Sequence, residues 1–273
     1  MSDLQNKTVL ITGASYGIGA ATARAFGRRG AHVILLARTQ SALEEVARDI
    51  RASGGAASVY PVDLTDARAV EDVARQVLAT TGPPDILLSN AGAGRWLFIE
   101  ETTPEEAVTM MAMPYFAAFY VTRAFLPAMR ARGSGHLAYV NSPASLVAWP
   151  GAAAYTAARW ALRGLVEALR AELYGTRLRV TTIIPGLVAT TYFEHNPGVL
   201  DRVPGLARRL LPVLTADQAA TAIVRGIECG RREIVLPGML RLLYAAHAVA
   251  PGLVRYLTIL TGARQKDDRH YAR

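Results

Sequence analysis

The first motif of the chain is Thr12-Gly13-Ala14-Ser15-Tyr16-Gly17-Ile18-Gly19, which joins an apolar run, 7–12, to an amphipathic run, 17–29. The first run is typical of a buried strand and the second of a helix. Three glycines in the joining turn let it tighten, so that backbone N–H groups gather at the helix N-terminus, where a pyrophosphate can bind. A strand, a glycine-rich turn and a helix in this order predict the start of a nucleotide-binding α/β fold.

The same alternation of apolar and amphipathic runs continues along the chain. Continuous apolar strands separated by helices indicate a parallel sheet that is covered on both faces. We therefore expect a single doubly wound Rossmann domain over residues 1–237. The expected strands are 7–12, 31–37, 57–62, 85–90, 135–142, 178–185 and 233–236. The expected helices are 17–29, 40–52, 66–80, 104–132, 152–174 and 215–229, the last with Thr215 as its N-cap.

Two segments depart from this pattern. Residues 187–213 lack a sustained period, and a long irregular segment in a compact domain is usually functional, so we expect a substrate lid there. Residues 238–273 are predicted to form a C-terminal helical extension with a polar tail. Within it, 239–262 is apolar but too short and interrupted to span a membrane. It would either cover the pocket or an oligomer partner as a helical pair, or make a peripheral membrane contact.

The composition limits the classes of partner. The formal net charge is +8, but the basic residues are scattered, so we expect no nucleic-acid binding; anionic cofactors or lipid surfaces fit the excess better. A single cysteine, Cys229, fits a reducing compartment, and the polar start of the chain has no secretory signal. We expect a cytoplasmic protein. The histidines show no metal-ligand spacing, so no metal site is expected; they are His32, His136, His195, His247 and His270.

Three residues suggest proton-transfer chemistry. Tyr155 and Arg159 are four residues apart, so on a helix they share one face. A nearby cation stabilises a phenolate, which allows a phenol to exchange protons. Ser142 lies thirteen residues upstream of the tyrosine, and its hydroxyl could hold a substrate oxygen beside it.

Taken together, these motifs resemble the short-chain dehydrogenase/reductase family over residues 7 to about 190. Tyr155 and Ser142 match its catalytic tyrosine and serine, and Arg159 stands where the family has a lysine. The resemblance implies an oxidoreductase in which the tyrosine is the general acid/base and the serine polarises a substrate carbonyl. It also implies that Arg159 holds the nicotinamide ribose, and that long helices pair in a homodimer or homotetramer. The other matching motifs are 12–19 (T-G-x-x-x-G-x-G), Asp63-Leu64, Asn90-Ala91-Gly92 and 185–190 (P-G-x-V-x-T).

The cofactor can be predicted from the end of the second expected strand. An acidic residue there would bind ribose hydroxyls and repel a 2′-phosphate, but the chain has Arg38, whose guanidinium can bind phosphate. We therefore expect NADP (NADPH) over NAD. The residues expected to bind it are Gly13, Ser15, Tyr16, Gly17, Ile18, Gly19, Arg38, Asp63, Leu64, Asn90, Ala91, Gly92, Tyr155, Arg159, Pro185, Gly186, Val188 and Thr190.

Two departures from the family pattern bear on the expected mechanism. Arg159 keeps the positive charge of the lysine, but a guanidinium stays protonated and cannot pass a proton on. Aligned back from Thr122, the family's proton-relay asparagine corresponds to Pro114. Proline lacks that amide, although it kinks a helix by itself.

These residues predict an NADP-dependent ketone reductase or alcohol dehydrogenase that acts on a bulky apolar substrate. Two alternatives remain open. One is an NADP(H)-binding sensor or scaffold with weak or no catalysis, and the other is a membrane-associated lipid or steroid reductase. The aromatic residues expected to line the pocket are Trp96, Phe98, Trp149, Tyr192 and Phe193.

Overall fold

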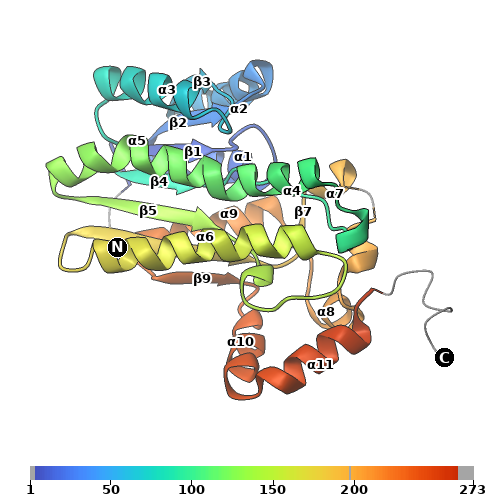
Figure 1. The fold of residues 1–273 in the computed structure, drawn as a ribbon. Helices are drawn as coiled ribbons and strands as arrows, with labels where there is room; N and C mark the ends of the chain where they lie inside the picture. The colour runs from blue at the N-terminus through green and yellow to red at the C-terminus, as the bar shows by residue number, and fades with distance from the viewer. Residues whose placement is uncertain (1–3, 197, 264–273) are drawn as a thin grey trace, which may run out of the picture.

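The computed structural model describes residues 4–196 and 198–263, and a seven-stranded parallel sheet runs through them (Figure 1). The strand order is β3-β2-β1-β4-β5-β6-β9, so the order reverses between β1 and β4. This confirms the predicted doubly wound sheet. The strands are β1 (Thr8–Thr12), β2 (His32–Ala37), β3 (Ala56–Pro61), β4 (Ile86–Ser89), β5 (Gly135–Val140), β6 (Leu178–Pro185) and β9 (Glu233–Leu236).

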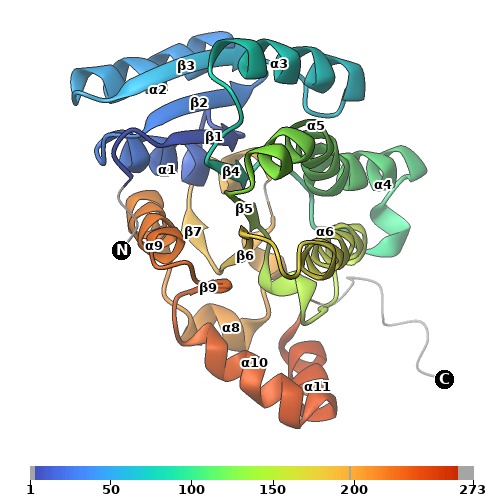
Figure 2. The same cartoon turned by 90° about the vertical axis from the view of Figure 1, so that its left-hand side faces the viewer.

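Helices cover both faces of this sheet (Figure 2). Along β1, Val9 and Ile11 belong to the core on one face and Leu10 to the core on the other. Alternate side chains of a strand point to opposite faces, which explains why the central strands are apolar throughout. One face packs against α1 (Gly17–Gly27), α2 (Gln40–Ala52) and α9 (Ala216–Glu228). The other packs against α3 (Ala67–Thr80), α5 (Ala117–Arg132) and α6 (Ala153–Glu172).

The prediction of one continuous helix over 104–132 is wrong at its centre. The segment forms α4 (Pro104–Met111), a π-helical turn (Ala112–Phe116) and then α5. Met113 has φ −129° and ψ 101°, outside the helical region. A residue that precedes a proline is disfavoured in the α region, so Pro114 explains the break.

The expected lid, 187–213, has more regular structure than its pattern indicates. It begins with β7 (Val188–Ala189), which pairs in parallel with β8 (Leu214–Thr215) just beyond it. Between these strands lie α7 (Tyr192–His195) and α8 (Gly205–Leu210). The expected N-cap is present, because Thr215 Oγ1 accepts a hydrogen bond from Gln218 N at 3.1 Å.

Two helices form the expected C-terminal extension. They are α10 (Leu240–Val249) and α11 (Pro251–Thr261), and they lie with α8 at one end of the molecule (Figures 1 and 2). Pro251 is the first residue of α11, where a missing N–H costs nothing. Among the described helices, none combines the length and apolarity needed to cross a bilayer. The predicted polar tail, with His270, lies outside the described residues.

Candidate active site

A cavity of about 590 Å³ opens at the carboxyl ends of the sheet strands. Its lining includes residues that directly follow β1, β2, β4, β5 and β6. Ligands of open α/β sheets bind in this crevice, where the strand order reverses. The cavity brings together Ser142, Tyr155 and Arg159, which lie up to 17 residues apart in the sequence.

The glycine-rich turn lies tightly against the end of β4. Gly13 has φ +63°, and a Cβ on it would lie 2.8 Å from Ala91 Cα. Asn90 Nδ2 donates to the carbonyls of Thr12 and Gly13 at 3.0 and 3.2 Å. A Cβ on Gly19 would lie 2.2 Å from the Gly13 oxygen. Gly19 therefore supports the turn by close packing and, unlike Gly13 and Gly17, does not line the cavity.

Ser142 follows β5 in extended backbone. Its Oγ accepts a hydrogen bond from Ala144 N at 3.2 Å, which leaves its O–H free to donate. The preceding Asn141 is buried; its Oδ1 accepts from Ser142 N at 3.0 Å and its Nδ2 donates to the Arg159 carbonyl at 3.2 Å. Asn141 thus joins the serine segment to α6. No role for Asn141 was predicted from the sequence, although a polar residue at the end of a buried strand often indicates a functional or structural contact.

Tyr155 and Arg159 lie on one face of α6, each only 6% exposed. The guanidinium carbon is 5.0 Å from the centroid of the tyrosine ring. Arg159 Nη1 donates to the Val140 carbonyl at 3.2 Å, and Nε has no hydrogen-bond partner within residues 4–196 and 198–263. A Cβ on Gly92 would lie 2.9 Å from Nη2. A buried cation with so few protein acceptors is suited to hold the oxygens of a bound ligand.

Aromatic side chains form one wall of the cavity. Trp96 lies between Trp149 and Tyr155, with ring centroids 5.0 and 5.4 Å away. Tyr192 donates its hydroxyl to the Gly94 carbonyl at 2.7 Å. Burial, and then the neighbouring Tyr155, raises the pKa of Tyr192. Four of the five expected aromatics line the cavity, namely Trp96, Trp149, Tyr192 and Phe193.

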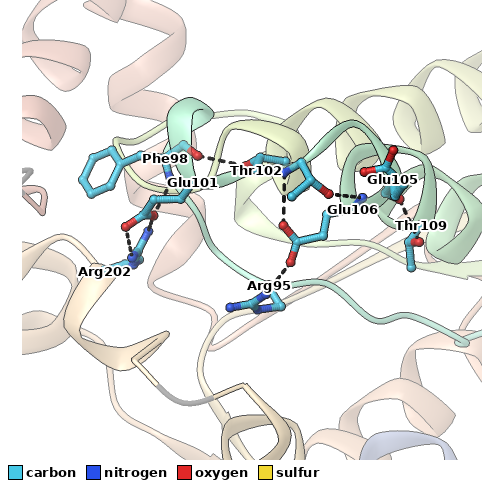
Figure 3. Close-up of polar contacts among 9 residues, drawn as sticks. Arg95, Phe98, Glu101, Thr102, Glu105, Glu106, Thr109 and Arg202 are labelled. Atoms are coloured by element: carbon cyan, nitrogen blue, oxygen red, sulfur yellow. Dashed lines mark hydrogen bonds and ion pairs between the residues drawn. The ribbon is translucent and has the colours of Figure 1, made fainter.

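Phe98, the fifth, lies outside the cavity in a polar cluster (Figure 3). The Arg202 guanidinium stacks 5.0 Å from its ring centroid and forms two hydrogen bonds to the Glu101 carboxylate, at 2.5 and 3.0 Å. The bonds from Arg202 lower the pKa of Glu101, and a backbone bond from Phe98 adds to this. Arg95 pairs with Glu106 nearby. The Arg202–Glu101 pair ties the lid segment to the loop after β4.

The structure separates the predicted cofactor residues into two groups. Arg38 is exposed, lines the cavity and lies in no ion pair with another described residue. Asp63 does not line the cavity; its carboxylate accepts from Thr65 N and Oγ1 at 2.9 and 2.8 Å, and these bonds lower its pKa. The predicted cofactor residues that do line it are Gly13, Ser15, Tyr16, Gly17, Ile18, Arg38, Leu64, Asn90, Ala91, Gly92, Tyr155, Arg159, Pro185, Gly186, Val188 and Thr190.

Comparison with known proteins gives a family match. The family model described as short chain dehydrogenase matches residues 7–197. An uncharacterized oxidoreductase of Mycobacterium tuberculosis is 39% identical over 229 residues, which are 82% of this chain and 64% of that protein. The chain therefore spans less than two thirds of that relative. A fatty acyl-CoA reductase of Acinetobacter baylyi is 32% identical over 253 residues, which are 92% of this chain and 82% of the relative.

Solved structures share the fold. A metagenomic short-chain oxidoreductase in complex with NADP is 32% identical, with a TM-score of 0.72 over 86% of this chain and 98% of the other. A short chain dehydrogenase/reductase from Burkholderia phymatum in complex with NAD has a TM-score of 0.82 over 97% and 99%, at 22% identity. Structures with this fold therefore bind either cofactor.

Proposed function

Because the chain belongs to the short-chain dehydrogenase/reductase family, we propose that it reduces the carbonyl of a bulky apolar substrate with NADPH, or runs the reverse oxidation. The observation that carries this proposal is the meeting of Ser142, Tyr155 and Arg159 at one cavity with the glycine-rich turn. Ser142 follows β5, Tyr155 and Arg159 lie on α6, and the glycine-rich turn follows β1. A hydride-transfer site needs the proton-transfer residues and the cofactor-binding turn at one cavity.

The lining residues fit a dinucleotide. Gly13 and Gly17 have positive φ values and present no side chain at their two positions, so backbone N–H groups of the turn can approach a pyrophosphate. The Arg159 guanidinium lines the cavity, and its Nε has no acceptor among the described residues, so this side chain would bind ribose hydroxyls. The exposed guanidinium of Arg38 would bind a 2′-phosphate, which favours NADP; an NADP complex of a relative supports this assignment.

Each side chain at the carbonyl has a distinct task. The nicotinamide supplies the hydride when the cofactor is bound. The free O–H of Ser142 would donate to the carbonyl oxygen and polarise it, while the Tyr155 hydroxyl gives that oxygen its proton. The Arg159 guanidinium beside the ring would stabilise the resulting phenolate. Since a guanidinium stays protonated, the proton that restores the phenol has to come from solvent.

The wall of the cavity supports an apolar substrate. Trp96, Trp149 and Phe193 line it near Tyr155, and Leu187 and Val203 extend the lining toward the lid. A pocket of this kind binds mainly through apolar contact, with a few polar groups that fix orientation. A large, weakly polar ketone would fit these properties better than a sugar or a charged acid.

The test follows NADPH oxidation with a panel of aliphatic and aromatic ketones and aldehydes. We expect Tyr155→Phe to lower kcat on the best substrate by about 10²–10⁴-fold, which is the usual range for a general acid. NADPH affinity, measured by fluorescence titration, should stay within about twofold, because the phenol makes only one of many contacts. Unchanged turnover in Tyr155→Phe would contradict the proposal.

Arg159 also favours a second candidate, a protein that binds NADP(H) with little catalysis. A guanidinium cannot relay a proton, and Pro114 supplies no side-chain amide to hold a relay water. Tight NADPH binding without turnover of any carbonyl in the panel would support this candidate over the reductase.

A further inference from the structure

Helix α10 is apolar on two opposite faces. One face, with Leu240, Leu243 and Tyr244, packs toward the body of the molecule. The other carries a stripe at helical spacing in which Leu242 and Val249 are 73% and 86% exposed. A helix that keeps a second apolar face in water marks an interaction surface, because an isolated soluble chain gains nothing from it.

The neighbouring helices extend this exposed stripe. In α11, Val254 is buried while Tyr256 and Ile259 on other faces are more than half exposed. Helix α8, which contacts α11, exposes Leu206 and Leu210. All three helices lie at the same end of the molecule (Figures 1 and 2). We call this set the C-terminal apolar face; its members are Leu206, Leu210, Val213, Met239, Leu242, Val249, Leu253, Tyr256, Ile259 and Leu260.

The two segments that form this face carry basic but no acidic residues. Residues 203–216 and 238–263 contain no aspartate or glutamate. They carry four exposed arginines, Arg208, Arg209, Arg241 and Arg255. Of these only Arg208 lies near a carboxylate among the described residues, 4.0 Å from Asp201 at the edge of the face. An apolar surface with a cationic rim complements an anionic lipid bilayer, which offers hydrocarbon beneath negative headgroups.

We propose that the C-terminal apolar face docks on the surface of an anionic membrane. A second copy of the chain fits this face less well. A twofold interface places the same patch on both partners, so it would set these arginines against each other with only Asp201, at the edge of the face, to offset them. The bilayer instead pairs each arginine with a phosphate and covers the exposed leucines with acyl chains.

The docked helices also form part of the active-site lining. Leu240, Leu243 and Thr258, together with Ala207 and Leu211, line the cavity from α8, α10 and α11. The same helices would therefore touch the bilayer on one face and the substrate on the other. This step rests on the proposed function: the substrate would be an apolar carbonyl compound that partitions into the bilayer and passes between these helices.

The test is co-sedimentation of the full chain with phosphatidylcholine vesicles, with and without phosphatidylglycerol. We expect binding at least tenfold tighter to the anionic vesicles, and weaker binding as salt rises. The double variant Leu242→Asp/Ile259→Asp should bind at least tenfold more weakly, since it removes two large side chains from hydrocarbon. Tyr174→Asp is the matched control, because Tyr174 is 90% exposed and lies outside this face.

Three results would overturn the proposal. They are no binding to anionic vesicles, equal binding by the double variant and the Tyr174→Asp control, and a concentration-dependent dimer that the double variant abolishes. Vesicle binding is measured without substrate, so its failure would leave carbonyl reduction untouched. Conversely, Tyr155→Phe should lose turnover but bind vesicles normally. The double variant should also keep NADPH binding and turnover of a water-soluble ketone, which shows that it folds.

Discussion

Arg159 stands where the sequence resemblance predicts a lysine, and its surroundings give an arginine there a physical meaning. The guanidinium lies over the tyrosine ring with one hydrogen bond to a strand carbonyl. A lysine ammonium would place its charge at a single point, whereas the planar guanidinium can bond two oxygens at once. The substitution thus retains the positive charge and the donor capacity but removes a group that could exchange a proton.

We expect Arg159→Met to weaken NADPH binding by about 10–100-fold and to lower kcat as well. The reason is that hydrogen bonds to a charged group contribute about 1.5–3 kcal/mol, and the phenolate would lose its cation. Arg159→Lys keeps the charge and should stay within about tenfold of the wild type in both quantities. Fluorescence titration and steady-state kinetics measure these effects. A methionine variant with wild-type kinetics would show that the cation has no role.

Arg38 should determine the choice between the two cofactors. It is exposed, lines the cavity and stands where an acid would repel a 2′-phosphate. Arg38→Ala should raise the Kd for NADPH by about 10–100-fold, because a charge-assisted bond to phosphate is lost, and leave the Kd for NADH nearly unchanged. Titration with both cofactors checks this. Equal losses for NADPH and NADH would show that Arg38 does not contact the phosphate.

At the level of elements, segment 187–213, the expected lid, is tied to the loop after β4 by the Arg202–Glu101 pair. The bidentate pair of Arg202 and Glu101 is partly exposed, so its contribution is modest. We expect Glu101→Gln to raise KM about three- to tenfold with little change in kcat, since the substrate would then have to order the lid. Glu106→Gln is the control, because it breaks the nearby pair with Arg95 without touching the lid. The same rise in KM for both variants would contradict a specific role for the tether.

The pairing of β5 with β6 contains a pH-sensitive contact. His136 is buried and its Nε2 lies 2.7 Å from Thr181 Oγ1; burial, and then Arg179, lowers its pKa to about 4. In the unfolded chain the pKa is about 6.5, so between these values the unfolded state binds more protons. Stability is therefore fully present above about pH 6.5 and falls as the pH drops toward 4.

Urea unfolding at two pH values measures this effect. From pH 7 to 5 the free energy of unfolding should fall by about 2 kcal/mol from this group alone. In His136→Gln that part of the fall should disappear, because glutamine can still bond Thr181 but does not titrate. An equal pH dependence in the variant and the wild type would show that His136 is not the titrating group.

The sequence predicts the regular elements well and the irregular ones poorly. All seven sheet strands coincide with predicted strand runs, and burial on both faces imposes an apolar pattern on the central ones. The edge strand β3 has no buried residue, so its prediction rests on the alternation with helices. A kink at Pro114 was expected, but the full break at Met113 was not, since a proline in a helical pattern does not reveal whether the helix kinks or stops. The pairing of β7 with β8 involves only two residues in each strand, too few to form a pattern.

The candidate active site was likewise predicted well where it depends on regular elements and poorly where it depends on contacts between distant segments. Ser142 and the glycine-rich turn, both expected at strand ends, line the cavity because carboxyl ends of parallel strands meet at one edge, and Tyr155 lines it from α6. Contacts between side chains from distant segments could not be predicted. One example is the hydrogen bond from the Asn141 side chain to the Arg159 carbonyl. Another is Asp63, whose carboxylate accepts a hydrogen bond from Thr65 and does not line the cavity.

At the scale of the whole molecule, a second exposed surface lies on α5, α6 and the π-helical turn before α5, away from the C-terminal apolar face (Figure 2). Phe116 and Phe119 are more than a third exposed and belong to a run of aromatic rings whose neighbouring centroids are 5.1–6.4 Å apart. Trp160 on α6 is about half exposed. Aromatic residues of this kind are enriched in protein–protein interfaces, as is arginine, and the Arg163 guanidinium lies 6.0 Å from the Trp160 ring centroid.

We therefore expect the chain to self-associate through α5 and α6, and the two surfaces to be separable by mutation. Phe119→Asp/Trp160→Asp places four charges in a twofold interface, so size-exclusion chromatography with light scattering should give a monomer where the wild type gives a dimer or tetramer. Leu242→Asp/Ile259→Asp should leave the mass unchanged, because it alters only the surface proposed to meet lipid. If instead the second pair of substitutions dissociates the oligomer while the first leaves it intact, the assignments of the two surfaces are reversed.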